Sequence, residues 1–328
     1  MRTSIYDPGA DYAIGIDVGG TKINAGIVGS NGETLLSVSL PTKAGSSTVG
    51  DRIAVAVQRL LDWVREQGEI ERKGKEMSIR GIGIGTAGQV DWRTGAIRYA
   101  SDLLPGYTGT PLKSDMEKRF GLPVVVDNDV NVLSLAEKHA GIGKGAKQMI
   151  CLALGTGVGG VLVNDGKIVH GVWGGAGEIG HLSVDYRGLP CICGGRGCLE
   201  AYASGTSIAK RMNERLAEAG ADSLGGPLDT RATVDRWQAG DPLATAVMDE
   251  AIEALGSAIS GLLHVFNPEL VVIGGGLADV GEPLLSRIRE ETRKRTMPSF
   301  YDGVRIVLPS HGNYGGMIGA AMQLWEYR

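Results

Sequence analysis

Two segments of the chain share one pattern, in which an apolar strand runs into a glycine turn and then into a second strand. They read IGIDVGGTKINAGIV at residues 14–28 and ICLALGTGVGGVLV at residues 150–163. When the two are superposed, Gly19 matches Gly155 and Asp17 matches Ala153, so only the first segment carries an acidic residue. The repeated strand–turn–strand pattern predicts a chain of two similar halves.

Between and after these segments, strands alternate with helices, which predicts an α/β fold. The apolar spacing of residues 51–67 indicates a helix, with Asp51 as its N-cap and Gly68 as its stop. Further helices are expected over residues 111–121, 203–218, 241–266 and 315–326.

Composition narrows the class of protein. The 328 residues suffice for two domains, and 43% hydrophobic with 21% charged residues favours a packed core. The formal net charge of −4 gives no reason to expect nucleic acid or an anionic membrane as partner. The first residues lack the apolar stretch of a signal peptide, and no run is long enough to span a membrane. We therefore expect a soluble, cytoplasmic protein.

The motif DVGGTK, residues 17–22, follows the first strand. Gly19 and Gly20 allow backbone N–H groups to approach a phosphate, and Thr21 and Lys22 add donors. Asp17 is placed to hold Mg²⁺ through water. An ordinary glycine hairpin is the alternative, but LGTGVGG (154–160) and GGG (274–276) also follow apolar strands, which favours a nucleotide held between the halves.

The motif VDNDVN, residues 126–131, lies where a strand ends and a helix begins. Asp and Asn are favoured N-caps, so one of them is expected to cap the helix. Three such residues exceed what capping requires, and the carboxyl end of a strand is where ligands bind in α/β sheets. Asp129 is suited to accept a hydroxyl proton, and Asn128 to hold the neighbouring hydroxyls.

One histidine and three cysteines form a candidate metal site, His181, Cys191, Cys193 and Cys198. Four ligands of this kind suit a closed, structural, tetrahedral Zn²⁺ site. A redox pair would favour Cys-x-x-Cys, whereas the spacings here are Cys-x-Cys and Cys-x₄-Cys, so we favour zinc. Glu178 and Glu200 lie beside these ligands, and the metal does not need them. We interpret them as acceptors for a polyhydroxy ligand, although a single glutamate would more simply be a solvated surface residue.

Taken together, these motifs resemble those of the ROK family of sugar kinases and repressors. In chain order they are GIDVGGTK, VDNDVN, LGTGVGG, GEIGH, CICGGRGCLE and NPELVVIGGG, and the resemblance extends from about Gly15 to Gly319. It implies an actin-like, hexokinase-like ATPase fold of two α/β domains that flank a cleft, and a homodimer. We expect a smaller domain over residues 1–127, completed by a C-terminal helix over 313–328. The larger domain would cover 128–312 and contain the zinc loop 181–198.

The resemblance also implies residue roles, with Asp129 as catalytic base and His181 serving both zinc and sugar. The sugar would contact Gly88, Asn128, Asp129, Glu178, His181 and Glu200. The ATP phosphates would contact Gly19, Gly20, Thr21, Lys22, Thr156 and Gly157, with Gly275 and Gly276 near the adenosine. The implied activity is transfer of the ATP γ-phosphoryl group to the 6-hydroxyl of a hexose, with Mg²⁺ and structural Zn²⁺ as cofactors.

Glucose is the favoured acceptor, with N-acetylglucosamine and N-acetylmannosamine as alternatives. We expect residues 100–112, ASDLLPGYTGTPL, to help to shape the pocket around the C2 substituent. The repressors of the family carry a DNA-binding region ahead of DVGGTK, and the 13 residues before Ile14 are too few for one, so we expect a kinase. Three other readings stay open: a sugar-sensing regulator without turnover, a polymerising actin-like ATPase, and a zinc-dependent hydrolase, which the closed ligand set disfavours.

Overall fold

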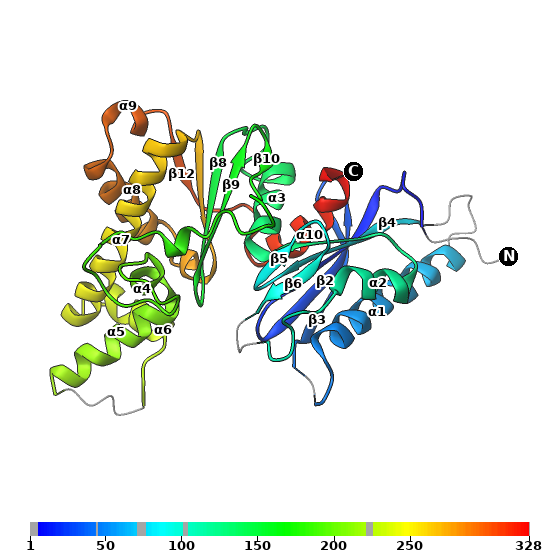
Figure 1. The fold of residues 1–328 in the computed structure, drawn as a ribbon, viewed down its shortest axis with the longest axis horizontal. Helices are drawn as coiled ribbons and strands as arrows, with labels where there is room; N and C mark the ends of the chain where they lie inside the picture. The colour runs from blue at the N-terminus through cyan, green and yellow to red at the C-terminus, as the bar shows by residue number, and fades with distance from the viewer. Residues whose placement is uncertain (1–5, 44, 71–76, 101–103, 221–225, 328) are drawn as a thin grey trace. The chain divides into compact units, whose positions relative to one another are not determined.

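The structure is a computed structural model that describes residues 6–43, 45–70, 77–100, 104–220 and 226–327. The chain forms two compact units (Figure 1). Unit 1 consists of Met1–Gly145, Val169–Ala176 and Ser310–Arg328, and unit 2 consists of Ala146–Ile168 and Gly177–Pro309. The chain therefore passes between the units at 145/146, 168/169, 176/177 and 309/310.

Each unit contains a 5-stranded sheet, and the two sheets have the same topology. The strand order is β3-β2-β1-β4-β7 in unit 1 and β10-β9-β8-β11-β12 in unit 2. In each sheet the first three strands of that order pair antiparallel, and the remaining neighbours pair in parallel. The predictions of an α/β fold and of two similar halves are confirmed. The strands are β1 Tyr12–Val18, β2 Lys22–Gly29, β3 Thr34–Pro41, β4 Ile79–Thr86, β7 Val124–Asn128, β8 Met149–Leu154, β9 Val158–Asn164, β10 Lys167–Ile168, β11 Leu270–Gly274 and β12 Arg305–Val307, with a separate hairpin of β5 Gln89–Asp91 and β6 Ala96–Tyr99.

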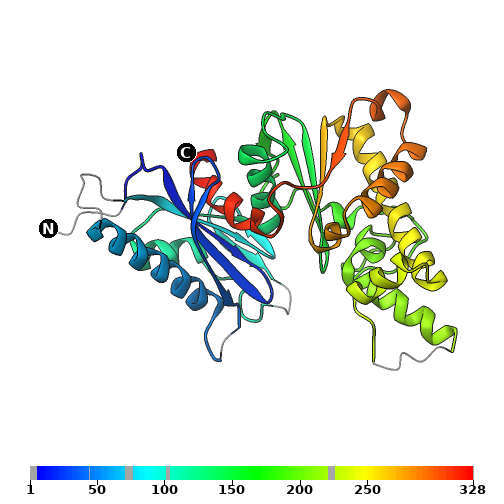
Figure 2. The same cartoon turned by 180° about the vertical axis from the view of Figure 1, so that it is seen from behind.

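Helices cover the sheets of both units. In unit 1, α1 and α2 pack on one face of the sheet, and α3 and α10 pack on the opposite face (Figures 1 and 2). In unit 2, the long helix α7 packs with α5, α6 and α8 to form the second core. The helices are α1 Val49–Ile70, α2 Leu112–Phe120, α3 Asp129–Ala140, α4 Glu200–Ala203, α5 Gly205–Glu218, α6 Thr230–Gln238, α7 Pro242–Phe266, α8 Glu282–Arg295, α9 Pro298–Tyr301 and α10 Gly315–Glu326, with short 3₁₀ turns η1 Ile179–His181, η2 Gly276–Val280 and η3 Gly312–Tyr314.

The alternation of isoleucine and glycine in β4 explains how unit 1 fits helices on both faces of its sheet. Ile82 and Ile84 are fully buried in the core that α1 covers, and Gly83 between them faces α10. A Cβ atom at Gly83 would lie 1.7 Å from the carbonyl oxygen of Ala320. Because side chains alternate between the faces of a strand, glycine at every second position lets the α10 backbone lie directly on the sheet.

Helix α1 begins and ends differently from the prediction. Thr48 precedes the helix, and its Oγ1 accepts a hydrogen bond from the Asp51 N–H at 3.1 Å. The Asp51 carboxylate in turn accepts one from the Thr48 N–H at 3.2 Å. Asp51 is therefore the second member of a reciprocal capping pair, and the prediction that it is the N-cap is wrong. Gly68 lies within the helix, which continues to Ile70.

The division into units differs from the predicted boundary at 127/128. Helix α3 and the residues up to Gly145 belong to unit 1, because α3 packs against α10 and the end of β4. Gly319 of α10 lies so close to α3 that a Cβ atom there would be 1.6 Å from the Val132 carbonyl oxygen. The C-terminal segment that belongs to unit 1 begins at Ser310 rather than at residue 313.

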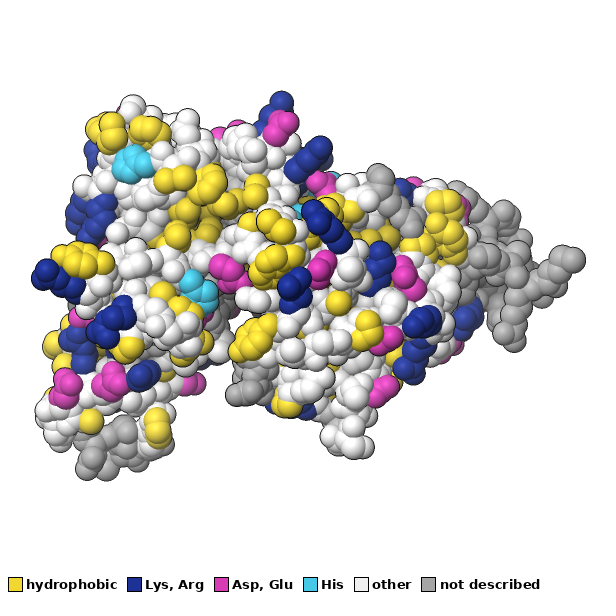
Figure 3. Space-filling view, viewed as in Figure 1, with side chains coloured by type: hydrophobic (Ala, Val, Ile, Leu, Met, Phe, Trp, Pro, Cys, Tyr) yellow, Lys and Arg dark blue, Asp and Glu magenta, His cyan; other side chains and the backbone are white. Residues whose placement is uncertain are grey.

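Among the described residues, no helix has the length and apolar character needed to cross a membrane. On the face shown in Figure 3, basic and acidic side chains are interspersed, in keeping with a small formal net charge of −4.

A buried carboxylate on α3 holds two of the segments that connect the units. Glu137 is fully buried and accepts backbone N–H bonds from Ile142 at 3.1 Å, Ser310 at 2.9 Å and His311 at 3.1 Å. His311 Nδ1 lies 3.1 Å from the same carboxylate. Ile142 precedes the crossing at 145/146 and Ser310 follows the crossing at 309/310, so Glu137 anchors both on unit 1.

We expect Glu137→Gln to lower the free energy of unfolding by about 2–4 kcal/mol, because the amide NH₂ would face backbone donors that need acceptors. Urea denaturation followed by circular dichroism measures this change. The control is Glu290→Gln on α8, where the glutamate side chain is 65% exposed, and its effect should stay within about 0.5 kcal/mol. A loss below about 1 kcal/mol for Glu137→Gln would contradict this role for the buried carboxylate.

Candidate functional site

The glycine turn between β1 and β2 is held by hydrogen bonds at both ends. The Gly19 N–H donates to the Lys22 carbonyl at 3.0 Å. Thr42, a buried residue just after β3, donates from Oγ1 to the Gly19 carbonyl at 2.8 Å and from its N–H to the Thr21 carbonyl at 2.9 Å. Thr21 and Lys22 are exposed. The turn is thus fixed at its base and open at its tip, as a phosphate-binding loop requires.

Asp17 lies near the C-terminal end of β1, beside the first turn of α10. A Cβ atom at Gly316 would be 2.7 Å from the Asp17 Cγ, so only glycine leaves room for the carboxylate. Burial, together with the negative charge of Asp129, raises the pKa of Asp17 to about 6, while Asn24 and Lys22 act in the opposite direction. Two neighbouring carboxylates that repel each other are a suitable place for a divalent cation.

The corner between β7 and α3 brings three predicted residues together. Asn128 is the N-cap of α3, and its Oδ1 accepts from the Val130 N–H at 2.9 Å. Its Nδ2 donates to the Gly88 carbonyl at 3.0 Å, which joins the loop after β4 to this corner. The expectation that one residue of VDNDVN caps the helix is confirmed. Asp129 is the next residue and remains partly exposed at the first turn of α3.

In unit 2, the second glycine turn lies beside a predicted sugar ligand. The Gly155 N–H donates to the Gly157 carbonyl at 2.9 Å, which closes the turn between β8 and β9. The carboxylate of Glu200 accepts from the Val158 N–H at 2.9 Å. Gly275 lies against the end of β8, where a Cβ atom would be 2.5 Å from the Leu154 nitrogen. Unit 2 therefore gathers Thr156, Gly157, Glu200, Gly275 and Gly276 around one end of its sheet.

A short antiparallel pairing joins the segment that carries His181 to the segment that carries Glu200. Ser183 bridges to Cys198, and the Leu199 N–H donates to the Leu182 carbonyl at 2.9 Å. His181 directly precedes one of these paired segments, and Glu200 directly follows the other. Glu178 is exposed and immediately precedes the turn η1, which packs on β9. The three predicted sugar ligands of unit 2 thus lie on neighbouring segments.

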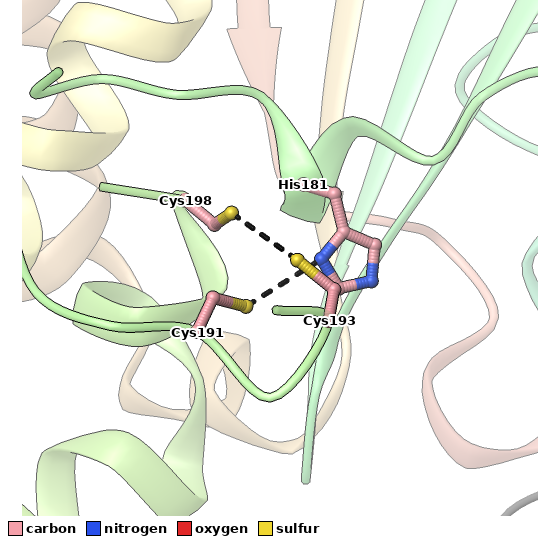
Figure 4. A group of neighbouring side chains, drawn as sticks. All are labelled: His181, Cys191, Cys193 and Cys198. Carbon is pink, nitrogen blue, oxygen red and sulfur yellow. Dashed lines mark hydrogen bonds between the residues drawn. The ribbon is translucent and has the colours of Figure 1, made fainter. Parts of the chain in front are cut away.

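The side chains of His181, Cys191, Cys193 and Cys198 converge (Figure 4), and their ligand atoms all lie within 4.8 Å of one another. His181 Nδ1 is 3.7 Å from Cys191 Sγ, and Cys193 Sγ is 3.6 Å from Cys198 Sγ. Zn–S bonds of about 2.3 Å in a tetrahedron place two sulfur atoms about 3.8 Å apart, so this donor set fits zinc. The histidine uses Nδ1 toward the sulfurs, and its other ring nitrogen points away from them.

The thiols themselves favour a bound cation. The Gly195 N–H lies 3.4 Å from Cys193 Sγ, and this hydrogen bond lowers the pKa of Cys193. Burial and the neighbouring thiols raise the pKa of Cys198 to about 12. A metal ion would supply the positive charge that a thiolate at Cys198 lacks.

Two residues that position parts of the candidate site were not predicted from the sequence. Thr42 belongs to no motif, and its contact with Gly19 comes from the pairing of β2 with β3. Asp127 stands inside VDNDVN but is only 1% exposed, and it accepts hydrogen bonds from the Asn128 N–H and the Asn131 side chain. Its place directly before Asn128 and Asp129, which the sequence analysis assigned to the ligand, was the only signal. Of residues 100–112, the structure buries Leu104, Tyr107 and Leu112, and residues 101–103 lie outside the described part.

The chain matches the family model described as the ROK family over residues 13–326. The chain belongs to the ROK family. This confirms the resemblance read from the motifs. Among its ROK relatives, a glucokinase from Halalkalibacterium halodurans is 38% identical over 317 residues, which cover 94% of this chain and 93% of that protein.

Solved structures agree with this assignment. The ROK hexokinase from Thermus thermophilus superposes with a TM-score of 0.81 at 32% identity, covering 96% of this chain and 98% of that one. A ROK family glucokinase from Streptomyces griseus, solved in complex with glucose and AMPPNP, gives a TM-score of 0.77 at 32% identity and covers 94% and 98% of the two chains. The predicted hexokinase-like ATPase fold is confirmed.

The raised pKa of Asp17 leads to a prediction about stability and pH. Because the folded pKa is about 6 and the ordinary value is 3.8, the folded protein binds more protons than the unfolded chain between these values. The contribution of Asp17 to stability is therefore present below pH 4 and is lost as the pH rises through 6. Asp17→Asn should gain stability relative to the unchanged protein as the pH rises, by up to about 3 kcal/mol above pH 7.

Urea denaturation at several pH values between about 4 and 8, in the presence of a chelator, measures this difference. A difference between the two proteins that is constant over this range would show that the pKa of Asp17 is not raised.

Proposed function

We propose that this chain is an ATP-dependent glucokinase that transfers the γ-phosphoryl group of ATP to the 6-hydroxyl of glucose. The observation that carries the proposal is the similarity over 94% of the chain to a ROK glucokinase solved with glucose and AMPPNP. The glucokinase from Halalkalibacterium halodurans, at 38% identity, supports the same acceptor.

In this proposal Asp129 is the catalytic base. It stands at the first turn of α3, next to Asn128, whose side chain is oriented by its bonds to Val130 and Gly88. Asp129 would accept the proton of the 6-hydroxyl as that oxygen attacks phosphorus in line with the leaving group. Phosphoryl transfer passes through a loose transition state, so accurate placement of the hydroxyl matters more than the strength of the base.

The other sugar hydroxyls would be held by Gly88 and Asn128 of unit 1 and by Glu178, His181 and Glu200 of unit 2. Carboxylates accept hydroxyl protons in strong hydrogen bonds, and the histidine adds a ring nitrogen. Glu200 is already oriented by the Val158 N–H, which gives it a fixed position when the sugar arrives.

The phosphates of ATP would lie on the two glycine turns. These are formed by Gly19, Gly20, Thr21 and Lys22 in unit 1 and by Thr156 and Gly157 in unit 2, with Gly275 and Gly276 near the adenosine. Asp17 would hold Mg²⁺, which neutralises charge on the phosphates as the bond breaks. Its pKa of about 6 leaves the carboxylate ionised at neutral pH, as a metal ligand must be.

We also propose that His181, Cys191, Cys193 and Cys198 bind a structural zinc ion. A closed Cys₃His set leaves no position for a reacting water, so its role would be to fix the segment that carries His181 and Glu200. The resemblance further carries the expectation of a homodimer, which light scattering on the purified protein measures directly.

We expect Asp129→Asn to lower kcat by about 10²–10⁴-fold, because the base is lost while the sugar contacts remain. The assay measures ADP release with glucose, N-acetylglucosamine, N-acetylmannosamine or no sugar, and calorimetry measures glucose affinity, which should change only a few fold. The matched control is Asp115→Asn, which alters an exposed aspartate in the first turn of α2 and should leave turnover unchanged.

Other outcomes would reject parts of the proposal. Near-normal turnover of Asp129→Asn would show that another group accepts the proton. ADP release that does not depend on sugar would indicate an ATPase, and glucose binding without any turnover would indicate a sensor. If the protein phosphorylates an N-acetylhexosamine and not glucose, the N-acetylhexosamine is the acceptor.

We expect the protein to contain about one zinc ion per chain, and Cys193→Ser to lose most of it. Glucose affinity should weaken as well, because the segment with His181 and Glu200 would no longer be fixed. Cys151→Ala is the control, since Cys151 is buried in β8 and lies outside the cluster. Elemental analysis of freshly purified protein gives the metal content, and the absence of zinc there would refute the site.

A further inference from the structure

A short excursion of the chain from unit 2 carries His170 into unit 1. Residues 169–176 belong to unit 1, although β10 before them and Gly177 after them belong to unit 2. The excursion closes on itself through the Ala176 N–H, which donates to the His170 carbonyl at 3.2 Å. It is therefore a compact loop inserted into unit 1 rather than an extended connection.

The loop docks on the β5–β6 hairpin of unit 1 at three points. The Trp92 N–H donates to the Trp173 carbonyl at 3.4 Å. The Arg98 guanidinium lies over the Trp173 ring, 4.8 Å from its centroid. Gly174, with φ of +120°, lies so close to the hairpin that a Cβ atom would be 2.3 Å from the Val90 carbonyl oxygen. These contacts determine where the loop lies on unit 1.

The strongest contact of the loop is made by His170 with Asp127. His170 Nε2 lies 2.7 Å from Asp127 Oδ2, and the two side chains are only 7% and 2% exposed. A carboxylate is an acceptor, so Nε2 carries the proton that is shared. Tyr327 adds a second donor to Oδ2 at 3.3 Å, and burial raises its pKa, which keeps the phenol protonated. Each of these hydrogen bonds stabilises the folded protein, because a buried carboxylate without partners would lower the free energy of unfolding.

Aromatic packing orients the His170 ring. The ring of Trp92 stacks on it with centroids 4.5 Å apart and an interplanar angle of 17°. Tyr327 meets it edge-on, with centroids 5.7 Å apart. The ring is thus held between two aromatic side chains, and its Nε2 faces Asp127.

The same carboxylate holds the corner that bears the proposed base. Asp127 Oδ1 accepts from the Asn128 N–H at 2.8 Å and from the Asn131 Nδ2 at 2.7 Å. Asn128 and Asp129 follow directly, at the start of α3. On the other side, the loop ends at Ala176, only two residues before Glu178. One buried carboxylate therefore bonds both to the corner with the base and to the loop that leads into GEIGH.

We propose that Asp127 and His170 are positioning residues, whose bond holds together, within unit 1, the corner with Asn128 and Asp129 and the loop that leads to Glu178. The expected effect of this pair on catalysis rests on the proposed function. Neither residue touches the sugar in this scheme. Their bond fixes the loop 169–176, which ends two residues before Glu178, whereas the two glycine turns are held by the separate contacts of Thr42 and Glu200.

Three variants separate this role from simple stabilisation. His170→Phe keeps an aromatic ring between Trp92 and Tyr327 but removes the N–H donor. His170→Gln keeps a donor but removes the ring. The control is His264→Gln in unit 2, where the histidine also has a hydrogen bond, from the Met297 N–H at 3.1 Å, and an edge-on aromatic contact with Phe300.

We expect His170→Phe to lower kcat/KM for glucose by about 10–100-fold, since a misplacement of about 1 Å has effects of that size. The KM for ATP should stay within about twofold, and His170→Gln should recover most of the loss. Hydrogen exchange should become faster in His170→Phe at both the 127–131 corner and residues 170–182. His264→Gln should change none of these, even where it lowers the melting temperature.

The proposal is overturned if His170→Phe alters kcat/KM for glucose no more than His264→Gln does. It is also overturned if the KM values for glucose and ATP rise together, which would indicate a general structural defect. Hydrogen exchange tests the positioning role independently of the activity. If the unchanged protein phosphorylates no sugar, the proposed function fails. Faster exchange at both segments then still supports the positioning pair, and faster exchange confined to residues 170–176 overturns it.

Discussion

The direct contact between the α10 backbone and the first sheet is the constraint on which unit 1 depends. Glycine at alternate positions of β4 leaves one side of that strand without side chains, and α10 lies on it at Gly83. Gly319 then lets α3 approach α10 equally closely. As a result the first turn of α10 meets Asp17, and the first turn of α3 carries Asp129. A larger residue at Gly83 or Gly319 would therefore move two helices and both carboxylates.

Two buried carboxylates attach the connecting segments to this frame. Glu137 binds the segments near 145/146 and 309/310, and Asp127 binds the excursion between 168/169 and 176/177. A buried carboxylate is stable only when its oxygens accept several hydrogen bonds. Each of these two carboxylates therefore binds several backbone or side-chain donors at once and holds their segments in place. Both side chains come from the continuous β7–α3 segment, which makes that segment the link between the frame, the corner with Asp129 and the rest of the chain.

Sequence reasoning was accurate where the cause of a structure is local. The strand–turn–strand repeat, helix α3 with its cap in VDNDVN, and the cluster of His181 with three cysteines all appear as predicted. It was inaccurate for α1, because both Thr48 and Asp51 are good capping residues and only their reciprocal bonds decide between them. Helices α6 and α8 were not predicted at all. In α8 the apolar positions Leu284, Leu285 and Ile288 are few among many charges, so the helical stripe is narrow.

By itself the sequence determined which chemical groups are available: the glycine turns, the acidic corner, the zinc-type ligand set and the alternating glycines of β4. These features depend on residues that are close together in the chain, and their local structure is determined by covalent geometry and local hydrogen bonds. Only the tertiary structure decided that His170 meets Asp127, that Ser310 meets Glu137, and that the pKa of Asp17 is raised. These contacts are made by residues that are far apart in the chain. They depend on burial, because the removal of water strengthens each hydrogen bond and the effect of each nearby charge on a pKa.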